Sequence, residues 1–190
     1  DNAPQDRLLR LSALLHDIGK PRVREEADGK IHFYNHESVG AEMAREIMER
    51  LRFSRDDIRK VTLLCRLHMV SYNLSWSDAA VRRLIRRAGR ENVSDLIALR
   101  KADIIAHGKD DDKLALISHL ETRVEKIKDN APSNIADLAL GGKEVMAILG
   151  IGQGPRVGEV MERLLDLVME NPEINTIKNL TEKLEELIEN

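Results

Sequence analysis

The stretch Leu14-Leu15-His16-Asp17-Ile18-Gly19-Lys20-Pro21 joins the end of an apolar helix to a His-Asp pair. Adjacent residues of a helix point about 100° apart, so His16 and Asp17 can reach one ion only where the helix ends. Gly19 predicts that end, because glycine is common just beyond a helix C-terminus. An isolated pair of this kind is usually a capped helix end with a solvated carboxylate, so its interpretation depends on the rest of the chain.

A second carboxylate occupies a position where helical spacing calls for an apolar residue. In the predicted helix 92–107, Leu96 and Leu99 define a buried face, and Asp103 lies on the same face. A buried carboxylate without a partner is costly enough to protonate or to find a cation. Asp103 therefore needs a cation nearby, and a bound metal ion is one candidate.

Two histidines are also predicted to face inward. His68 continues the apolar stripe of the predicted helix 54–71, and His36 shares a face with Val39 and Met43 in the preceding helix. A single inward histidine is usually a satisfied core residue. The combination favours a metal site instead, with the candidate ligands His16, Asp17, His36, His68 and Asp103. Imidazole and carboxylate ligands suit Mn, Fe, Zn, Ni or Co more than Ca, and Lys20 offers a cation to an anion held by the ion.

The doublet His16-Asp17 followed by the distant Asp103 resembles the HD superfamily of metal-dependent phosphohydrolases. More of the chain is similar to one branch, the HD domain and C-terminal region of class II tRNA nucleotidyltransferases, the CCA-adding and poly(A) polymerase group. The similar segments are 16–21, 29–36 with Glu37, Gly40 and Ala41, 80–85, 99–103, 142–146, 150–159 and 170–173. Together they cover most of the chain.

The resemblance implies an all-α fold. It places an HD-type helical bundle in residues 1–125 and a small helical C-terminal domain in residues 126–190. The composition agrees, since 42% hydrophobic, 33% charged and only 3% aromatic residues are typical of a helical protein with an aliphatic core. A change of composition at Ala131, followed by Pro132 and the pair Gly141-Gly142, marks the second part.

The chain departs from the family pattern in two ways. The family places its first metal-binding histidine on a helix upstream of the doublet, whereas none of the fifteen residues before His16 is a histidine. The first family helix and one ligand are therefore expected to be missing. No Gly-Ser turn followed by paired strand carboxylates occurs either, so the nucleotidyltransferase head and CCA addition are not expected here.

The resemblance also implies an activity and its residues. The HD part would hydrolyse phosphate esters, with 2′,3′-cyclic phosphates and nucleotide monophosphates as candidate substrates and tRNA as a partner. The implied divalent ion is Ni, Mn, Co, Fe, Zn or Mg, and its ligands are His16, Asp17 and Asp103, with His36 and His68 for a second ion or the substrate phosphate. His16, Asp17 and Lys20 are the predicted catalytic residues, because Lys20 would steady the leaving charge.

Two segments are candidates for RNA or phosphate contact. The first is the arginine run in residues 82–90. Such a run is usually a solvated face, but guanidinium groups also match phosphate oxygens. Arg82 is the arginine favoured to reach the metal cleft. The exposed N–H groups ahead of Pro155 could bind one phosphate, unless the glycines there serve a tight corner. The predicted contact residues are Lys20, Arg82, Arg83, Arg86, Arg87, Gly152, Gly154 and Arg156.

Charge and cysteine content narrow the class of protein. Residues 131–190 carry 5 Lys plus Arg against 11 Asp plus Glu, which weighs against broad phosphate binding by this tail. Cys65 is the only cysteine, so no internal disulfide is possible. No segment has the apolar length of a membrane span, and a cytoplasmic protein is expected.

Two alternative functions stay open, an RNA-holding module without turnover and a free-standing phosphohydrolase. The sequence does not indicate the oligomeric state.

Overall fold

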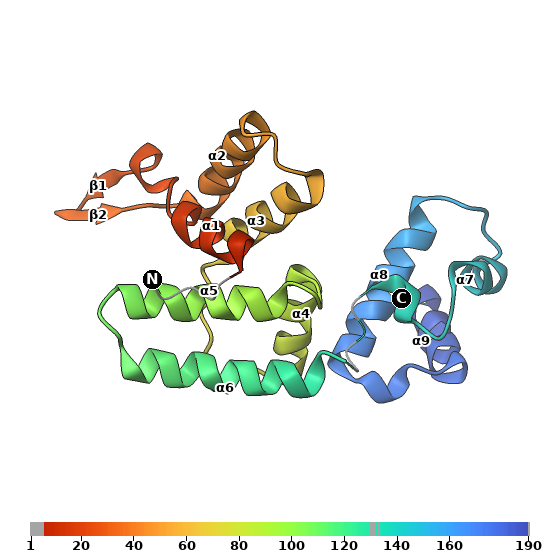
Figure 1. Ribbon diagram of the computed structural model, residues 1–190. Helices are drawn as coiled ribbons and strands as arrows, with labels where there is room; N and C mark the ends of the chain where they lie inside the picture. The colour runs from red at the N-terminus through yellow and green to blue at the C-terminus, as the bar shows by residue number, and fades with distance from the viewer. Residues whose placement is uncertain (1–5, 130–131, 133, 190) are drawn as a thin grey trace. The chain divides into compact units, whose positions relative to one another are not determined.

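The computed structural model describes residues 6–129, 132 and 134–189. The described residues form nine α-helices and one two-stranded sheet, which confirms the predicted all-α class (Figure 1). The chain divides into two compact units. The first unit comprises Asp1–Leu74 and Glu91–Thr122, and the second comprises Ser75–Arg90 and Arg123–Asn190. The predicted domain boundary at residue 125 stays a prediction, and Ala131 lies outside the described residues.

Side-chain caps begin two helices of the first unit. Asp6 accepts a hydrogen bond from the N–H of Leu9 at 2.8 Å, and Ser54 accepts one from the N–H of Asp57 at 3.1 Å. The elements of this unit are α1 (Arg7–Leu15), η1 (Lys20–Arg22), β1 (Glu25–Ala27), β2 (Lys30–His32), α2 (His36–Arg50), α3 (Arg55–Leu67), α5 (Val93–Ala106) and the first part of α6 (Asp111–Ile127).

The core of the first unit is aliphatic and holds the ends of three helices together. Helix α3 packs against α1, α2 and α5. The buried residues of this cluster are Leu15, Ala41, Ala44, Met48, Val61 and Cys65. Because α1 ends at Leu15 and α3 ends at Leu67, this packing brings the histidines that follow each helix to the same end of the bundle.

Gly19 is required for a reason other than the one predicted. Its φ of −74° is ordinary right-handed helical backbone, so it does not end the helix through a left-handed conformation. Instead, a Cβ at this position would overlap the carbonyl oxygen of His36 and lie 2.6 Å from the backbone N of Gly40. The turn after α1 therefore packs backbone to backbone against the first turn of α2, which fixes His16 and Asp17 relative to His36.

The second unit is organised around α8 (Pro155–Glu170), which contacts α4, α7, α9 and the short helices η2 and η3. Its buried face carries Met161, Leu164, Leu165, Val168 and Met169. The other elements are α4 (Asp78–Ala88), η2 (Ile135–Asp137), α7 (Gly142–Leu149), η3 (Pro172–Ile174) and α9 (Ile177–Glu189). Among all these described helices, none combines the length and apolarity that a membrane crossing needs.

We expect Gly19→Ala to disrupt the contact between the α1 turn and α2. The added methyl group would push two backbones apart, and overpacking of this kind typically costs about 1–3 kcal/mol. The measurement is the free energy of unfolding from denaturant titration. Gly158→Ala is the matched control, since nothing lies within 4 Å of its Cβ position on α8; equal stability of the two variants would contradict the assigned role of Gly19.

Candidate metal centre

Three histidines in the first unit are oriented by the same hydrogen bond. In each, Nδ1 lies within bonding distance of the main-chain carbonyl three residues earlier, and a carbonyl accepts only from an N–H. The pairs are His16 with Ala13 (2.9 Å), His36 with Phe33 (2.8 Å) and His68 with Cys65 (2.7 Å). We therefore assign the proton of each neutral ring to Nδ1, which leaves the Nε2 lone pair free to bind a cation.

The Nε2 atoms of His36 and His68 face each other at 3.2 Å and are buried. Because both Nδ1 atoms carry the ring proton, the Nε2 lone pairs of the two rings face each other at this distance. They repel each other unless a proton or a metal ion binds one or both of them. Asp17 Oδ1 lies 3.4 Å from Nε2 of His36 and 3.6 Å from Nε2 of His68. The arrangement places a negative charge next to two nitrogen donors, which is the environment of a cation.

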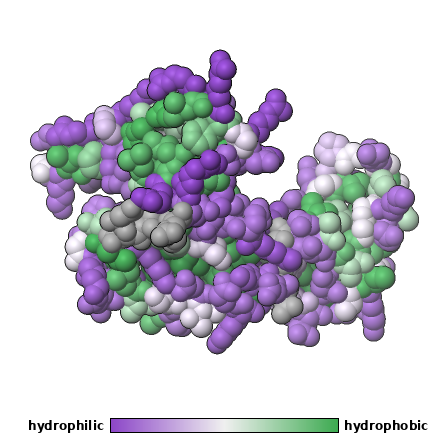
Figure 2. Space-filling view, in the orientation of Figure 1, coloured by the Kyte–Doolittle hydropathy of each residue, from purple (hydrophilic) through white to green (hydrophobic). Residues whose placement is uncertain are grey.

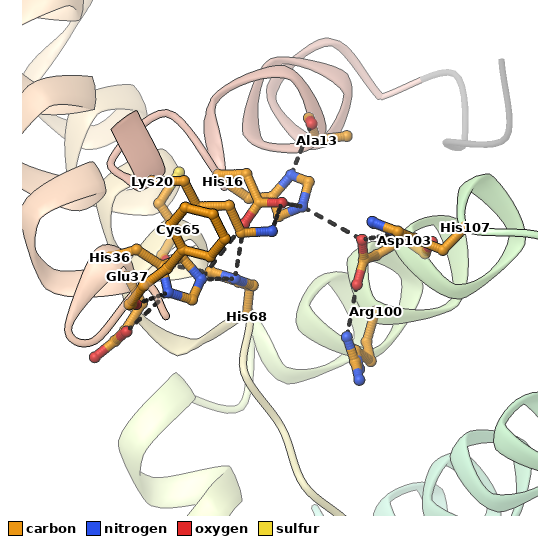
Figure 3. A network of polar contacts seen from close by, with 12 residues as sticks. Ala13, His16, Lys20, His36, Glu37, Cys65, His68, Arg100, Asp103 and His107 are labelled. Atoms are coloured by element: carbon orange, nitrogen blue, oxygen red, sulfur yellow. Dashed lines mark hydrogen bonds and ion pairs between the residues drawn. The ribbon is translucent and has the colours of Figure 1, made fainter. Parts of the chain in front are cut away.

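His16 joins this group to the second carboxylate. Its Nε2 lies 3.3 Å from Asp17 Oδ2 and 3.4 Å from Asp103 Oδ1 (Figure 3). This Nε2 atom is buried, and it has no hydrogen-bond partner among the described residues because it lies between the two carboxylates. Ligand atoms of His16, Asp17 and His68 lie within 4.8 Å of one another, which fits one ion with ligands about 2.0–2.2 Å away.

His16, Asp17 and His68 therefore form one candidate metal site, with His36 beside Asp17 and Asp103 beside His16, and the chemistry of these side chains fits a divalent transition metal. Imidazole nitrogens combined with carboxylate oxygens are borderline ligands that suit Zn, Ni, Co, Fe or Mn. The Nδ1 bonds to main-chain carbonyls supply the outer support that metal-binding histidines usually have.

The titration behaviour of the site shows how strongly it favours positive charge. Burial alone would lower the pKa of His16, but Asp103 and Asp17 outweigh burial and raise it from 6.5 to about 10. Burial likewise opposes ionisation of Asp17, yet His16 and Lys20 hold its pKa well below the usual range. The contact with His16 also lowers the pKa of Asp103, whereas burial lowers the pKa of His68. Without a metal ion, a proton on His16 supplies part of the missing positive charge.

A family model described as HD domain matches residues 2–108. This stretch contains the five candidate ligands, His16, Asp17, His36, His68 and Asp103. The chain belongs to the HD domain family.

This HD domain chain is also similar to two curated tRNA nucleotidyltransferases. It is 39% identical over 166 residues to an A-adding tRNA nucleotidyltransferase of Deinococcus radiodurans, a match that covers 85% of this chain and 37% of that protein. It is 36% identical over 160 residues to a CC-adding tRNA nucleotidyltransferase of Thermus thermophilus, covering 83% of this chain and 35% of that protein. The predicted resemblance is confirmed, and the chain spans little more than a third of each relative. No solved structure gave a significant match.

The HD doublet is supported by charged neighbours, two of which the sequence analysis missed. Lys20 Nζ donates to Asp17 Oδ2 at 2.5 Å. Arg100 Nη1 donates to Asp103 Oδ2 at 2.6 Å, and His107 Nδ1 lies 3.0 Å from Asp103 Oδ1. Arg100 lies three residues before Asp103 on α5, and His107 lies four residues after it, directly beyond the end of α5, so their helical spacing could have identified them.

A pocket of about 370 Å³ opens at the metal centre of the HD domain. Asp17, His68 and Asp103 line it. Its other charged lining residues are Lys20, Arg100, His107, Asp110 and Lys113. Lys20, Arg100 and Lys113 are the cations that an anionic ligand in this pocket would contact. A larger, mainly apolar groove of about 650 Å³ between α1 and α5 also reaches His16 and Asp103.

The predicted phosphate-binding arginines lie in the second unit and are largely engaged there. Arg82 Nη1 donates to the carbonyl of Met169 at 2.7 Å. Arg83 pairs with Glu170, and Arg86 pairs with Glu162. Arg87 is exposed. These contacts explain the arginine run as a salt-bridged face between α4 and α8, so phosphate contact by these arginines, and by Arg82 in the metal cleft, stays a prediction.

The second predicted phosphate contact lies at the start of α8. Gly152, Gly154 and Arg156 are exposed, and nothing lies within 4 Å of a Cβ built on either glycine. The alternative that these glycines serve close packing at a tight corner is therefore not supported. Phosphate binding at this helix start stays a prediction.

We expect Asp103→Asn to lower the affinity for Zn²⁺ or Mn²⁺ at least about tenfold, because it keeps the shape of the side chain but removes a ligand charge. Metal content by elemental analysis and affinity by calorimetry are the measurements. Asp95→Asn on the same helix is the control, since Asp95 pairs with Lys60 at 2.6 Å rather than with a site residue. Unchanged metal content in Asp103→Asn would show that Asp103 is not a ligand.

Metal binding should depend on pH through His16. A pKa raised from 6.5 to about 10 means that its proton stabilises the metal-free fold fully below about pH 6.5 and that this stabilisation is lost as the pH rises through about 10. A metal ion must displace this proton, so affinity should rise from pH 6 to 9 with release of about one proton. Calorimetry in buffers of different ionisation enthalpy measures that release; pH-independent affinity would contradict a protonated His16.

Proposed function

We propose that this HD domain hydrolyses phosphate esters of nucleotides or RNA ends, such as 2′,3′-cyclic phosphates, in a metal-dependent reaction. The observation that carries the proposal is the grouping of the Nε2 atoms of His16, His36 and His68 around the carboxylate of Asp17, with Asp103 also beside His16, next to a pocket that Lys20, Arg100 and Lys113 line. A divalent ion bound there would polarise the phosphoryl oxygen and lower the pKa of water. His16, Asp17 and Asp103 would hold it, with His36 and His68 directed at the same place.

The cations of the pocket would bind the phosphate once the carboxylates are neutralised. Lys20 is bonded to Asp17 and Arg100 to Asp103, so each now balances a carboxylate. When an ion takes over that balancing charge, both cations can turn towards an anionic substrate. Lys20 would then steady the charge that develops on the leaving oxygen, and Arg100 would orient Asp103 while contacting a phosphate oxygen.

A second candidate is an RNA-holding module whose site binds metal without turnover. One observation favours it: Lys20 and Arg100 are bonded to Asp17 and Asp103, so neither is directed at a substrate phosphate. The apolar groove between α1 and α5 would accommodate the histidine-bearing helix that the family resemblance implies. The two candidates share the metal site and differ only in whether phosphate is released.

tRNA is the proposed macromolecular partner. Both relatives are named as tRNA nucleotidyltransferases, and the proposal extends that partner to this chain, with a nucleotidyltransferase head in the parent protein and a cytoplasmic location. The exposed Arg87 and the segment 152–156 are the proposed local RNA contacts. The acidic C-terminal residues limit these contacts to local ones.

The test is hydrolysis of 2′,3′-cyclic AMP with saturating Mn²⁺, Ni²⁺ or Co²⁺, followed by phosphorus NMR. We expect slow turnover that Asp17→Asn reduces at least about 100-fold, because misplaced reacting groups cost that much, and that Asp95→Asn leaves unchanged. Fusing the upstream helix with its histidine should raise the rate at least about tenfold, or about 1.4 kcal/mol of barrier. A metal-loaded protein with no turnover in either form would exclude the hydrolase and leave the RNA-holding module.

A further inference from the structure

The hairpin of β1 and β2, which lies between the HD doublet and α2 in the sequence, consists largely of exposed residues. Strands β1 and β2 pair antiparallel with Glu25 opposite His32, and the ribbon extends away from α1, α2 and α3 (Figure 1). In the space-filling view this projection carries apolar area among hydrophilic residues (Figure 2). A two-stranded ribbon on its own is marginally stable in water. Its retained order therefore depends on residues at its base.

Two rings at the base of the hairpin form an exposed stack. His32 ends β2, and Tyr34 lies two residues further on in the turn before α2; their ring centroids are 5.2 Å apart and their planes are within 4° of parallel. The Tyr34 hydroxyl also lies 3.2 Å from Nδ1 of His32, which fixes the orientation of both rings. Tyr34 is 63% exposed, so stacking on His32 leaves much of its ring free. In a protein with only two Phe, two Tyr and one Trp, Phe33 and Tyr34 stand side by side in the sequence.

The stack is joined to the metal centre by a single carbonyl. The Phe33 oxygen, between the two stacked residues, accepts from both the backbone N (3.3 Å) and Nδ1 (2.8 Å) of His36. Tyr34 is two residues from His36, so their Cα atoms are at most about 7 Å apart. Asn35 between them adopts a left-handed φ of 60°, which turns the chain directly from the stack into α2.

A cation connects the same two places. Lys20 donates to Asp17 at the metal centre, and its Nζ lies 5.9 Å from the centre of the Phe33 ring. The segment 20–34 carries Lys20, Arg22, Arg24 and Lys30 against Glu25, Glu26 and Asp28. An exposed aromatic pair and a cation that also contacts the candidate phosphate site offer partners for the base and the phosphate of one nucleotide.

We infer that Tyr34 and His32 form a stacking surface for the nucleobase of the phosphate ester that binds at the metal centre. Aromatic rings stack on every base, so the surface selects nucleotides over simple phosphate esters without selecting a sequence. The inference rests on the proposed function in that it takes the phosphate to bind at the pocket beside His68 and Asp103. It adds a subsite: the residues that contact the base of the ester.

The test compares 5′-AMP with ribose 5-phosphate, which has the same sugar and phosphate but no base. Binding is followed by proton NMR of the Tyr34 ring and by calorimetry, with Zn²⁺-loaded protein and again with chelated protein, which cannot turn the ligand over. We expect AMP to shift the Tyr34 resonances and to bind the loaded protein at least about fivefold more tightly than ribose 5-phosphate. Tyr34→Ala should abolish this preference, Tyr34→Phe should keep it, and His32→Ala should weaken it.

The matched control is Ile31→Ala, which removes an exposed apolar side chain from the same strand outside the stacked pair. Equal affinity for the two ligands in the wild type, or equal loss of both in Tyr34→Ala, would overturn the stacking surface and leave phosphate binding intact. An AMP titration that moves no Tyr34 resonance would overturn it as well. AMP-induced shifts in a metal-loaded protein that hydrolyses nothing would support the surface and refute the hydrolase.

Discussion

The hydrogen bond from a histidine Nδ1 to the carbonyl three residues earlier is the interaction on which the candidate metal centre depends. It recurs at His16, His36 and His68, each at the end or the start of a helix, where the carbonyl or the ring is free of the regular helical pattern. Each bond selects one tautomer and one ring orientation. Three helix termini packed around one aliphatic core then bring three lone pairs to one place, and the carboxylates of Asp17 and Asp103 make that place attractive to a cation.

The backbone contact between Gly19 and Gly40 complements this interaction. The histidine bonds orient rings within their own segments, whereas the glycine contact sets the distance between segments. Side chains at either position would separate the HD doublet from His36 even if every ring kept its tautomer. Orientation and spacing are thus controlled by different residues, and the site needs both.

Helical spacing predicted which polar side chains turn towards the interior, because it reports which side chains face the core. His36, His68 and Asp103 interrupt apolar stripes, and a buried polar group without a partner nearby is costly enough to be informative. Spacing could not predict contacts between elements far apart in the sequence. Arg83 and Glu170 are 87 residues apart, and the local pattern contains no signal that they pair. The role of Gly19 was missed for the same reason, since its constraint comes from another helix rather than from its own φ.

The acidic C-terminal residues form ion pairs with the arginines of α4 and of the turn after it. Glu162 and Glu170 of α8 and Asp137 of η2 pair with arginines from α4 and the turn that follows it. The charge imbalance between the two parts of the sequence is therefore reduced within the folded second unit. Few of these guanidinium groups are left for another partner.

The order of the two units along the chain has a consequence for how the protein is made. Ser75–Arg90 belongs to the second unit but is translated before Glu91–Thr122, which completes the first. A nascent chain that has reached Leu74 contains His16, Asp17, His36 and His68 but still lacks Asp103, so the metal centre is completed only after α4 of the other unit has been synthesised. No single cleavage of the polypeptide releases either unit whole, and limited proteolysis between α3 and α4 would leave each fragment with an unfinished core.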